Sequence, residues 1–291
     1  MKDNEKILFI LNPVSGNKNH QNIETLIHQC IGNEYEYSII RTEYKEHGRD
    51  ICSEMMIDYS VIVAIGGDGT VNEIAGPLIG TNKHFGLIPT GSGNGFANFF
   101  KIPSDPKKAL QTIISHKIKT VDAIKLNDKF SVNMSGLGFD AHIAHLFADR
   151  DKRGFLSYIF LVMKEFNKYK SSEYLIKYDN NEIHRNAFLI SFANSTQFGN
   201  NAHIAPFAKT DDGFLDVCIL RKFSFFSAIP IGIRLFNKTI NKSKFYETFQ
   251  TKKIEIINIV DTKVHIDGEP ITFSGDIQIE IIPKSLNIIV P

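Results

Sequence analysis

The sequence is poor in cysteine, has no surplus of either charge and contains no long apolar run. Three cysteines among 291 residues, without a CxxC spacing, suggest neither a disulfide framework nor a cysteine zinc site and favour a reducing cytoplasm. The 33 basic and 32 acidic residues leave a formal charge of +1, so we expect no nucleic-acid partner. Any phosphate must therefore be bound locally.

No segment reaches the roughly 18 apolar residues that a membrane-spanning helix needs. The nearest approach, at 158–163, is far shorter, so we predict no transmembrane segment. The apolar run at 7–11 is also too short for the core of a secretory signal. We expect a cytoplasmic protein, or one that sits peripherally at the inner membrane surface.

The chain length corresponds to about two domains of roughly 150 residues. In the first 120 residues, apolar runs at 7–11, 35–40, 61–65 and 85–88 alternate with segments of helical period. This pattern predicts an α/β domain with parallel strands. After a boundary near 120–124, short alternating runs predict an antiparallel β domain. Two helical inserts interrupt that domain, at 155–166 and 223–236.

Three turns in the first domain follow predicted strands, where open α/β sheets bind ligands. The first turn consists of Asn12, Pro13, Val14, Ser15, Gly16 and Asn17. Its proline and glycine shape the turn, while Ser15 and the backbone N–H groups could bind a phosphate. An ordinary strand-to-helix turn would have a similar composition, so both interpretations stay open.

The second turn, residues 66–70, reads Gly-Gly-Asp-Gly-Thr and precedes a predicted helix. Three glycines let the backbone approach a polyanion. A carboxylate beside bound phosphate is repulsive unless a cation lies between them, so Asp68 implies Mg²⁺ on a nucleotide. The alternative is a structural turn in which Asp68 only caps the helix. We expect Thr70 to cap this helix, and Asn72 and Glu73 to point back toward the turn.

The third turn, residues 89–95, is also rich in glycine and precedes a short predicted helix. Two anion sites at neighbouring strand ends fit the two ends of a triphosphate. The Walker sequence is absent, and GxGxxG does not occur in the first turn. These absences argue against P-loop chemistry and against dinucleotide redox chemistry.

Together the motifs Asn-Pro-Val-Ser-Gly, Gly-Gly-Asp-Gly-Thr and Pro-Thr-Gly-Ser-Gly-Asn-Gly-Phe-Ala resemble the diacylglycerol kinase catalytic-domain family, in particular its bacterial soluble lipid kinases. The resemblance continues in order at Asp122, Asn133, 138–141, 211–215 and 267–270. The second motif alone is similar in NAD kinases and phosphofructokinases, whereas the ordered set is specific.

The resemblance implies a fold of the NAD kinase and diacylglycerol kinase type. A Rossmann-like nucleotide-binding domain would span 1–123, and a β-sandwich that binds lipid would span 124–282. A closing strand at 283–291 would return toward the first domain.

The same resemblance implies roles for individual residues. The positions that match ATP contacts are Asn12, Pro13, Val14, Ser15, Gly16, Thr42, Gly67, Asp68, Gly69, Thr70, Val71, Asn72, Glu73 and Ser92. Asp68 matches the residue that reaches the catalytic Mg²⁺ through water. Lys209, Asp212 and Phe214 match a second, structural metal site, with backbone carbonyls from Lys209 and Phe214. Without the resemblance, the segment 211–213 is only a turn signal.

Asp267, Gly268 and Glu269 have two interpretations. They can form a hairpin turn. Alternatively, Asp267 and Glu269 lie two apart in an extended segment, share a face, and take a proton from an acceptor hydroxyl. The resemblance makes Glu269 the expected proton acceptor, with Asp267 as its rival. Since both lie in the second domain, we expect a catalytic cleft between the domains.

One further segment suggests contact with a membrane. Residues 237–253 contain five lysines and one glutamate, interleaved with Phe245, Tyr246 and Phe249, which suits an anionic bilayer. A solvated face with its aromatic residues in the core is the other interpretation. The apolar stripe of Phe223, Phe226, Ile233 and Phe236 is expected to be buried.

His142 and His145, without a third ligand, are expected at the surface or in packing.

We therefore predict transfer of the γ-phosphoryl group of ATP, with Mg²⁺, to the hydroxyl of diacylglycerol or a related lipid at a membrane surface. Ser92 departs from the threonine of many members, and this variant resembles sphingoid-base and ceramide kinases, which are the alternative. An NAD kinase is less favoured, because no Thr/Ser/Tyr-rich loop follows residue 120. Intact Asp68 and Glu269 argue against a nucleotide sensor or lipid-transfer protein. A homodimer is left open.

Overall fold

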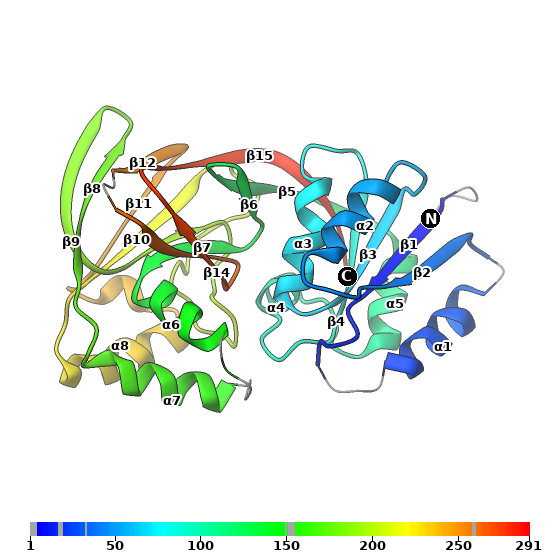
Figure 1. Cartoon of the computed structure of the whole chain (residues 1–291), viewed down its shortest axis with the longest axis horizontal. Coiled ribbons are helices and arrows are strands. Elements are labelled where there is room, and N and C mark those ends of the chain that lie inside the picture. Colours follow the sequence, from blue (N-terminus) through cyan, green and yellow to red (C-terminus); the bar gives the residue numbers. More distant parts are fainter. Residues whose placement is uncertain (1–4, 17–19, 33, 149, 151–154, 258–259) are drawn as a thin grey trace. The chain divides into compact units, whose positions relative to one another are not determined.

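The structure, a computed structural model, describes residues 5–16, 20–32, 34–148, 150, 155–257 and 260–291. The chain divides into two compact units (Figure 1). Unit 1 comprises Met1–Val121 and Lys284–Pro291, and unit 2 comprises Asp122–Pro283. Two long strands, β5 (Lys117–Leu126) and β15 (Ile277–Val290), each have residues in both units.

Unit 1 alternates strands and helices in the order β1, α1, β2, α2, β3, α3, β4, α4, α5. Their bounds are β1 Ile7–Leu11, α1 His20–Ile31, β2 Tyr37–Arg41, α2 His47–Met55, β3 Val61–Gly66, α3 Asp68–Leu78, β4 His84–Pro89, α4 Gly95–Phe99 and α5 Pro106–Ser115. The strands are parallel, in the order β4-β3-β1-β2, and the end of β15 extends the sheet beside β4.

Burial on both faces explains the continuous apolar strands of unit 1. Every residue of β1 and β3 is buried. Alternate β1 residues, including Ile7 and Phe9, share one core cluster with Ile27 of α1 and Ile113 of α5. This arrangement confirms the Rossmann-like α/β fold predicted for the first domain.

Unit 2 is built mainly from antiparallel strands, with three helices in its described part. Besides its share of β5 and β15, its elements are β6 Lys129–Ser131, β7 Met134–Gly138, α6 Phe139–Ala148, α7 Phe155–Phe166, β8 Ser172–Tyr178, β9 Asn181–Ala193, β10 Leu215–Arg221, α8 Phe225–Phe236, a 3₁₀ turn at Ile240–Lys242, β11 Tyr246–Thr251, β12 Lys253–Ile257, β13 Thr262–Ile266 and β14 Glu269–Phe273.

The long strand β9 pairs with three other strands of unit 2. Its first half pairs with β8, and its second half pairs with both β7 and β10. Apolar residues of these strands, such as Ile176, Ile190 and Val217, share one core cluster. A separate cluster includes Ile143 of α6, Leu161 of α7 and other residues that pack beside the helices. The predicted antiparallel β domain and its helical inserts are confirmed.

Asp216 of β10 is a buried carboxyl group that costs stability when it ionises. Its side chain is 7% exposed, and Gln250 Nε2 donates a hydrogen bond to Oδ2 at 3.3 Å. Burial, with a smaller contribution from the charge of Asp212, raises the pKa of Asp216 to about 6. Between pH 4 and 6 the folded state therefore holds a proton that the unfolded state releases, so stability should fall as the pH rises through this range.

We expect Asp216→Asn to raise the free energy of unfolding at pH 8 by about 1–2 kcal/mol, since the neutral amide avoids burial of a charge that Gln250 only partly compensates. At pH 4 the gain should nearly disappear. Urea unfolding at both pH values, with EDTA present, measures the difference. Asp128→Asn, at a carboxylate that is 76% exposed, is the matched control. An equal gain at pH 4 and pH 8 would contradict the assigned cause.

Candidate active site

The three glycine-bearing turns of unit 1 meet at the carboxyl ends of β1, β3 and β4. Backbone hydrogen bonds join them: Asn12 N–H donates to Ile65 O, and Thr90 N–H donates to Gly66 O, both at 2.9 Å. Asn12 Nδ2 also donates to Thr70 Oγ1 at 3.0 Å, which ties the first turn to the start of α3. Residues far apart in the sequence therefore form one continuous rim at this edge of the sheet.

The first and third turns are in close contact at Gly16. This residue has a φ of +71°, and an added Cβ would lie 1.9 Å from Thr90 O. The hydroxyls of Ser15 and Thr90 are hydrogen-bonded at 2.8 Å. Glycine is therefore required here both by its conformation and by the neighbouring backbone.

The second and third turns are equally close. A Cβ on Gly91 would lie 2.7 Å from Gly67 Cα, and a Cβ on Gly67 would lie 3.3 Å from Gly91 Cα. Two glycines of these turns are thus needed for packing between the turns. Their lack of side chains also leaves backbone exposed to a ligand.

Asp68 is the first residue of α3, and its carboxylate reaches the third turn. Its Oδ1 accepts a hydrogen bond from Phe96 N–H at 3.3 Å. Its Oδ2 lies 3.2 Å from the position that a Cβ on Gly93 would occupy. The negatively charged carboxylate of Asp68 therefore lies beside backbone N–H groups of a kind that bind phosphate. The donor set fits a hard cation held through water, as Mg²⁺ usually is.

The other candidate nucleotide contacts of unit 1 are distributed as follows. Thr42 is buried, and its N–H donates to Leu11 O at 2.9 Å, so it belongs to the same edge. Val14 and Ser92 are exposed, whereas the side chain of Val71 lies in the core. Pro13 is exposed, and Gly69 and Asn72 are partly buried.

Two expectations for α3 are wrong. Gly67 is its N-cap and Thr70 lies inside its first turn, where the hydroxyl accepts from Asn12 instead of capping the helix. Glu73 does not point back toward the glycine turn. Its Oε1 accepts from Glu46 N–H at 3.1 Å, at the start of α2. The partial positive charge at the N-terminus of α2 favours this carboxylate.

In unit 2, a turn at 209–214 contains the residues expected at the second metal. Its conformation is held by Asp122, a fully buried residue whose Oδ2 accepts from Gly213 N–H at 2.8 Å. Phe214 N–H donates to Asp212 Oδ1 at 3.1 Å. Lys209 is exposed, and its side chain carries the wrong charge for a ligand, so only its carbonyl could contribute. Two carbonyls and a carboxylate are hard oxygen donors that fit Mg²⁺ or Ca²⁺.

Asp267 and Gly268 form a tight hairpin turn between β13 and β14. Their φ values are +51° and +91°, and Ile266 pairs with Glu269 across the hairpin. Two successive positive φ values are characteristic of the type I′ turn that suits a two-residue hairpin. The interpretation of 267–269 as an extended segment is therefore wrong, and the hairpin interpretation is confirmed.

The carboxylate of Asp267 is fully engaged in backbone support. It is 9% exposed and accepts from Ser131 Oγ at 2.6 Å and from the N–H groups of Val132, Asn133 and Met134 at 2.9–3.0 Å. These bonds fix the connection between β6 and β7 to the hairpin. Glu269, by contrast, is exposed at the start of β14.

A buried pair behind this hairpin, His265 and Asp140, was not predicted from the sequence. His265 Nδ1 accepts from Gly268 N–H at 3.3 Å, and Nε2 lies 3.2 Å from Asp140 Oδ2. The backbone donor therefore places the ring proton on Nε2, facing Asp140. A histidine in the apolar end of β13, two residues before Asp267, was the available signal.

The remaining histidines singled out from the sequence behave as expected. His142 Nε2 lies 3.6 Å from Glu165, and His145 Nε2 lies 3.1 Å from Ile271 O, so both serve in packing and pairing. No helix in the described part of the chain is long and apolar enough to cross a membrane.

Comparison with known proteins identifies the class. Residues 6–126 match the diacylglycerol kinase catalytic domain, and residues 133–290 match the YegS C-terminal NAD kinase beta sandwich-like domain. The chain therefore belongs to the diacylglycerol kinase catalytic-domain family, a family of lipid kinases.

Individual relatives agree with this assignment. The chain is 30% identical to a protein of Enterobacter sp. (strain 638) named "Probable lipid kinase YegS-like", over 86% of this chain and 84% of that one. It is 29% identical to a protein of the same name from Chromohalobacter salexigens, over 79% and 76%. The crystal structure of a diacylglycerol kinase from Bacillus anthracis str. Sterne aligns over 100% of this chain and 98% of that chain, with a TM-score of 0.76 and 22% identity. This last likeness shows the shared fold.

Proposed function

We propose that the protein is an ATP- and Mg²⁺-dependent lipid kinase that transfers the γ-phosphoryl group to a lipid hydroxyl. One observation carries the proposal: three glycine-bearing turns are packed together at the carboxyl edge of a parallel sheet, with the carboxylate of Asp68 among them. Backbone N–H groups at such turns bind phosphate, and the acidic residue needs a cation to be compatible with it.

Phosphoryl transfer depends mainly on positioning and on neutralisation of charge. Backbone N–H groups of the turns would hold the phosphates, and the hydroxyls of Ser15 and Thr90, which lie together, would contact them. Asp68 would hold Mg²⁺ through water. When bound, Mg²⁺ supplies the positive charge that offsets the phosphate oxygens of ATP.

We assign proton removal from the lipid hydroxyl to Glu269. The structure supports this choice over Asp267, whose carboxylate already accepts hydrogen bonds from Ser131 and three backbone N–H groups. Glu269 is exposed at the start of β14, so an acceptor hydroxyl can reach its carboxylate from solvent. The catalytic cleft expected between the domains stays a prediction.

The turn at 209–214 would bind the second metal in a structural role. The carbonyls of Lys209 and Phe214 and the carboxylate of Asp212 would supply the oxygens, while Asp122 holds the turn from its buried side. This site lies in unit 2, so its metal would stabilise that unit.

Diacylglycerol or a related lipid is the proposed acceptor, and a sphingoid base or ceramide is the alternative suggested by Ser92. Incubation of the full chain with radiolabelled ATP and mixed micelles of diacylglycerol, sphingosine or ceramide, followed by thin-layer chromatography, tests this. We expect a labelled lipid that requires Mg²⁺. Label transferred only to NAD, or to no acceptor by folded protein, would overturn the proposal.

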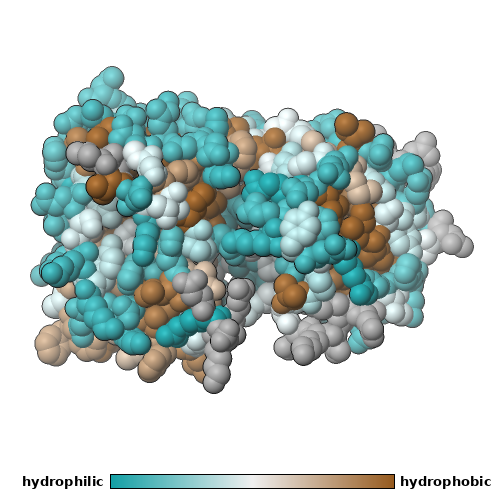
Figure 2. Space-filling view, viewed as in Figure 1, coloured by the Kyte–Doolittle hydropathy of each residue, from teal (hydrophilic) through white to brown (hydrophobic). Residues whose placement is uncertain are grey.

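Membrane contact is assigned to the helices α7 and α8. Leu156, Phe160 and Met163 form one exposed stripe on α7, at 83%, 65% and 61% exposure. A second exposed apolar stripe on α8 consists of Phe226, Ile229, Ile233 and Phe236. The prediction that the apolar face of this helix is buried is therefore wrong for these residues. The rings of Phe166, at the end of α7, and Phe225, at the start of α8, are in contact. Figure 2 shows apolar side chains on the part of the surface where Figure 1 shows these two helices.

Positively charged residues near these stripes favour an anionic bilayer as the surface that they contact. The exposed Lys222 and Lys238 flank α8, and Lys242 follows in the 3₁₀ turn. Such residues suit anionic headgroups while the apolar stripe enters the interface. The aromatic residues 245, 246 and 249 do not take part, because they pack against the core clusters of unit 2.

We expect the double variant Phe226→Ser/Ile229→Ser to lower binding to vesicles containing phosphatidylglycerol about tenfold or more, because two exposed apolar side chains leave the interface. Co-sedimentation with the vesicles measures the effect, and rates on short-chain, water-soluble acceptors should be unchanged. Ile57→Ser, at a residue of unit 1 that is 79% exposed, is the matched control. Equal losses in both proteins would refute this membrane face.

A further inference from the structure

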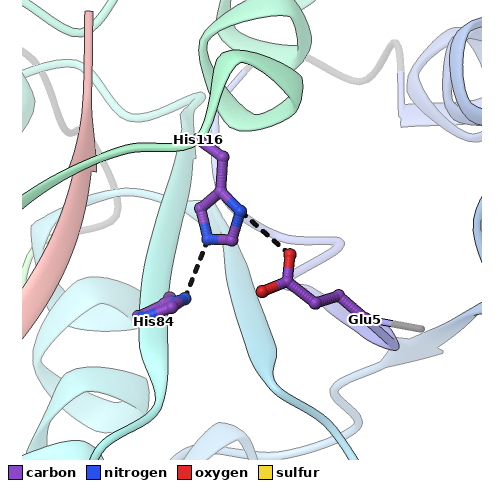
Figure 3. A group of neighbouring side chains, drawn as sticks. All are labelled: Glu5, His84 and His116. Atoms are coloured by element: carbon purple, nitrogen blue, oxygen red, sulfur yellow. Dashed lines mark hydrogen bonds and ion pairs between the residues drawn. The ribbon is translucent and has the colours of Figure 1, made fainter. Parts of the chain in front are cut away.

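The amino end of the unit 1 sheet carries a cluster of Glu5, His84 and His116 (Figure 3). Glu5 lies just before β1, His84 is the first residue of β4, and His116 ends α5 in a left-handed conformation with a φ of +53°. The glycine turns follow the carboxyl ends of β1, β3 and β4, so this cluster is separate from the candidate active site.

The side chains form a short chain of contacts centred on His116. Its Nε2 lies 2.8 Å from His84 Nδ1, and its Nδ1 lies 2.9 Å from Glu5 Oε2. The side chain of His116 is 9% exposed and that of Glu5 is 17% exposed. One ligand atom from each residue lies within 4.8 Å of the others. Across the described ranges, this is the one group of three His, Cys, Asp or Glu residues with such an arrangement.

The contact between the two imidazoles has a chemical consequence. Two ring nitrogens at this distance form a hydrogen bond only if one donates its proton and the other accepts with a lone pair. His116 Nε2 and His84 Nδ1 therefore share one proton in this hydrogen bond. A divalent cation can replace that proton, since neutral imidazole is a common metal ligand.

We propose that Glu5, His84 and His116 bind a divalent cation of the zinc class. Two histidines and a glutamate are a known donor set for Zn²⁺, with Zn–N distances of about 2.0–2.1 Å and tetrahedral geometry. Ligand nitrogens in such a geometry are about 3.3 Å apart, so the two rings need to separate by a few tenths of an ångström and to turn until both lone pairs face the cation. Imidazole ligands select zinc-class metals over Mg²⁺, which distinguishes this site from the nucleotide metal.

Glu5 contributes to this site through its carboxylate. In this structure its Oε2 lies 2.9 Å from His116 Nδ1, and the carboxylate would turn from that contact to supply the third ligand atom to the cation. Bound metal would join the starts of β1 and β4 to the end of α5. These are segments far apart in the sequence, so binding should stabilise unit 1 against unfolding.

Titration of the untagged full chain with ZnCl₂ or CoCl₂, after removal of metals with EDTA, tests the proposal. We expect one equivalent to bind, an upward shift of the thermal midpoint, and visible absorption typical of tetrahedral Co²⁺. His116→Asn and His84→Asn should each weaken binding by at least about thirtyfold, and Glu5→Gln by about tenfold. Asparagine tolerates the left-handed conformation of His116, so that variant should fold.

His184→Asn, at a histidine that is 75% exposed in unit 2, is the matched control and should bind like the unaltered chain. Circular dichroism establishes that each variant is folded. Absence of zinc and cobalt binding by the folded, unaltered chain would overturn the proposal. So would affinities that are the same in His116→Asn, His84→Asn and His184→Asn. These readouts do not involve phosphoryl transfer, so they stand apart from the proposed function.

Discussion

Replacing Asp68 with asparagine should lower the rate of lipid phosphorylation by about 10²–10³-fold, because one charged group that acts on the transferred phosphoryl has been removed. Asparagine keeps the size of the side chain and an oxygen that can accept the hydrogen bond from Phe96 N–H. The change is therefore confined to the negative charge. We also expect the Mg²⁺ concentration for half-maximal activity to rise.

Steady-state rates across a Mg²⁺ titration measure both effects. Asp58→Asn, at an exposed carboxylate elsewhere in unit 1, is the matched control and should retain the activity of the unaltered chain. Thermal unfolding distinguishes a lost metal contact from a misfolded turn. A correctly folded Asp68→Asn protein with near-normal rate and Mg²⁺ dependence would show that this carboxylate does not serve the catalytic metal.

Glu269→Gln should reduce kcat by about 10²–10⁴-fold while leaving the KM for ATP almost unchanged, because a general base acts on the acceptor hydroxyl and not on nucleotide binding. Glutamine preserves the shape of an exposed side chain at the start of β14, so the hairpin should remain intact.

Two comparisons sharpen this experiment. Glu182→Gln, at a glutamate of β9 that is 53% exposed, is the matched control and should leave kcat unchanged. Asp267→Asn should mainly lower the thermal midpoint, because it weakens the acceptor of four hydrogen bonds in the hairpin. A Glu269→Gln protein that changes only KM would assign a structural role to Glu269, and kcat loss with unchanged stability in Asp267→Asn would favour Asp267.

The alternation of strands and helices in unit 1 was predictable because it is local. Continuous apolar runs such as Val61–Gly66 are needed wherever a strand is buried on both faces. The chirality of parallel crossovers then places the turns after those strands at one edge. The close approach of Gly16 to Thr90, and of Gly67 to Gly91, was consistent with the glycine positions but could not be measured from them.

The wrong predictions concern side chains for which more than one partner or environment was compatible with the sequence. Glu73 accepts a hydrogen bond from Glu46 N–H at the start of α2, a contact between residues 27 positions apart that the sequence pattern does not place. Asp267 adopts a positive φ and binds the β6–β7 connection, although its spacing from Glu269 also suited an extended strand. The exposed stripe on α8 looked like a core face, because periodicity does not say what covers it.

By itself, the sequence determined the order of the elements, the antiparallel character of the second half and the family, since these depend on periodicity and on motifs of adjacent residues. Only the tertiary structure decided that Asp267 supports backbone while Glu269 is exposed, that His265 lies behind their turn, and that Glu5, His84 and His116 meet. The physical reason is distance along the chain: contacts between residues tens to more than a hundred positions apart form only when the packed sheets bring them together.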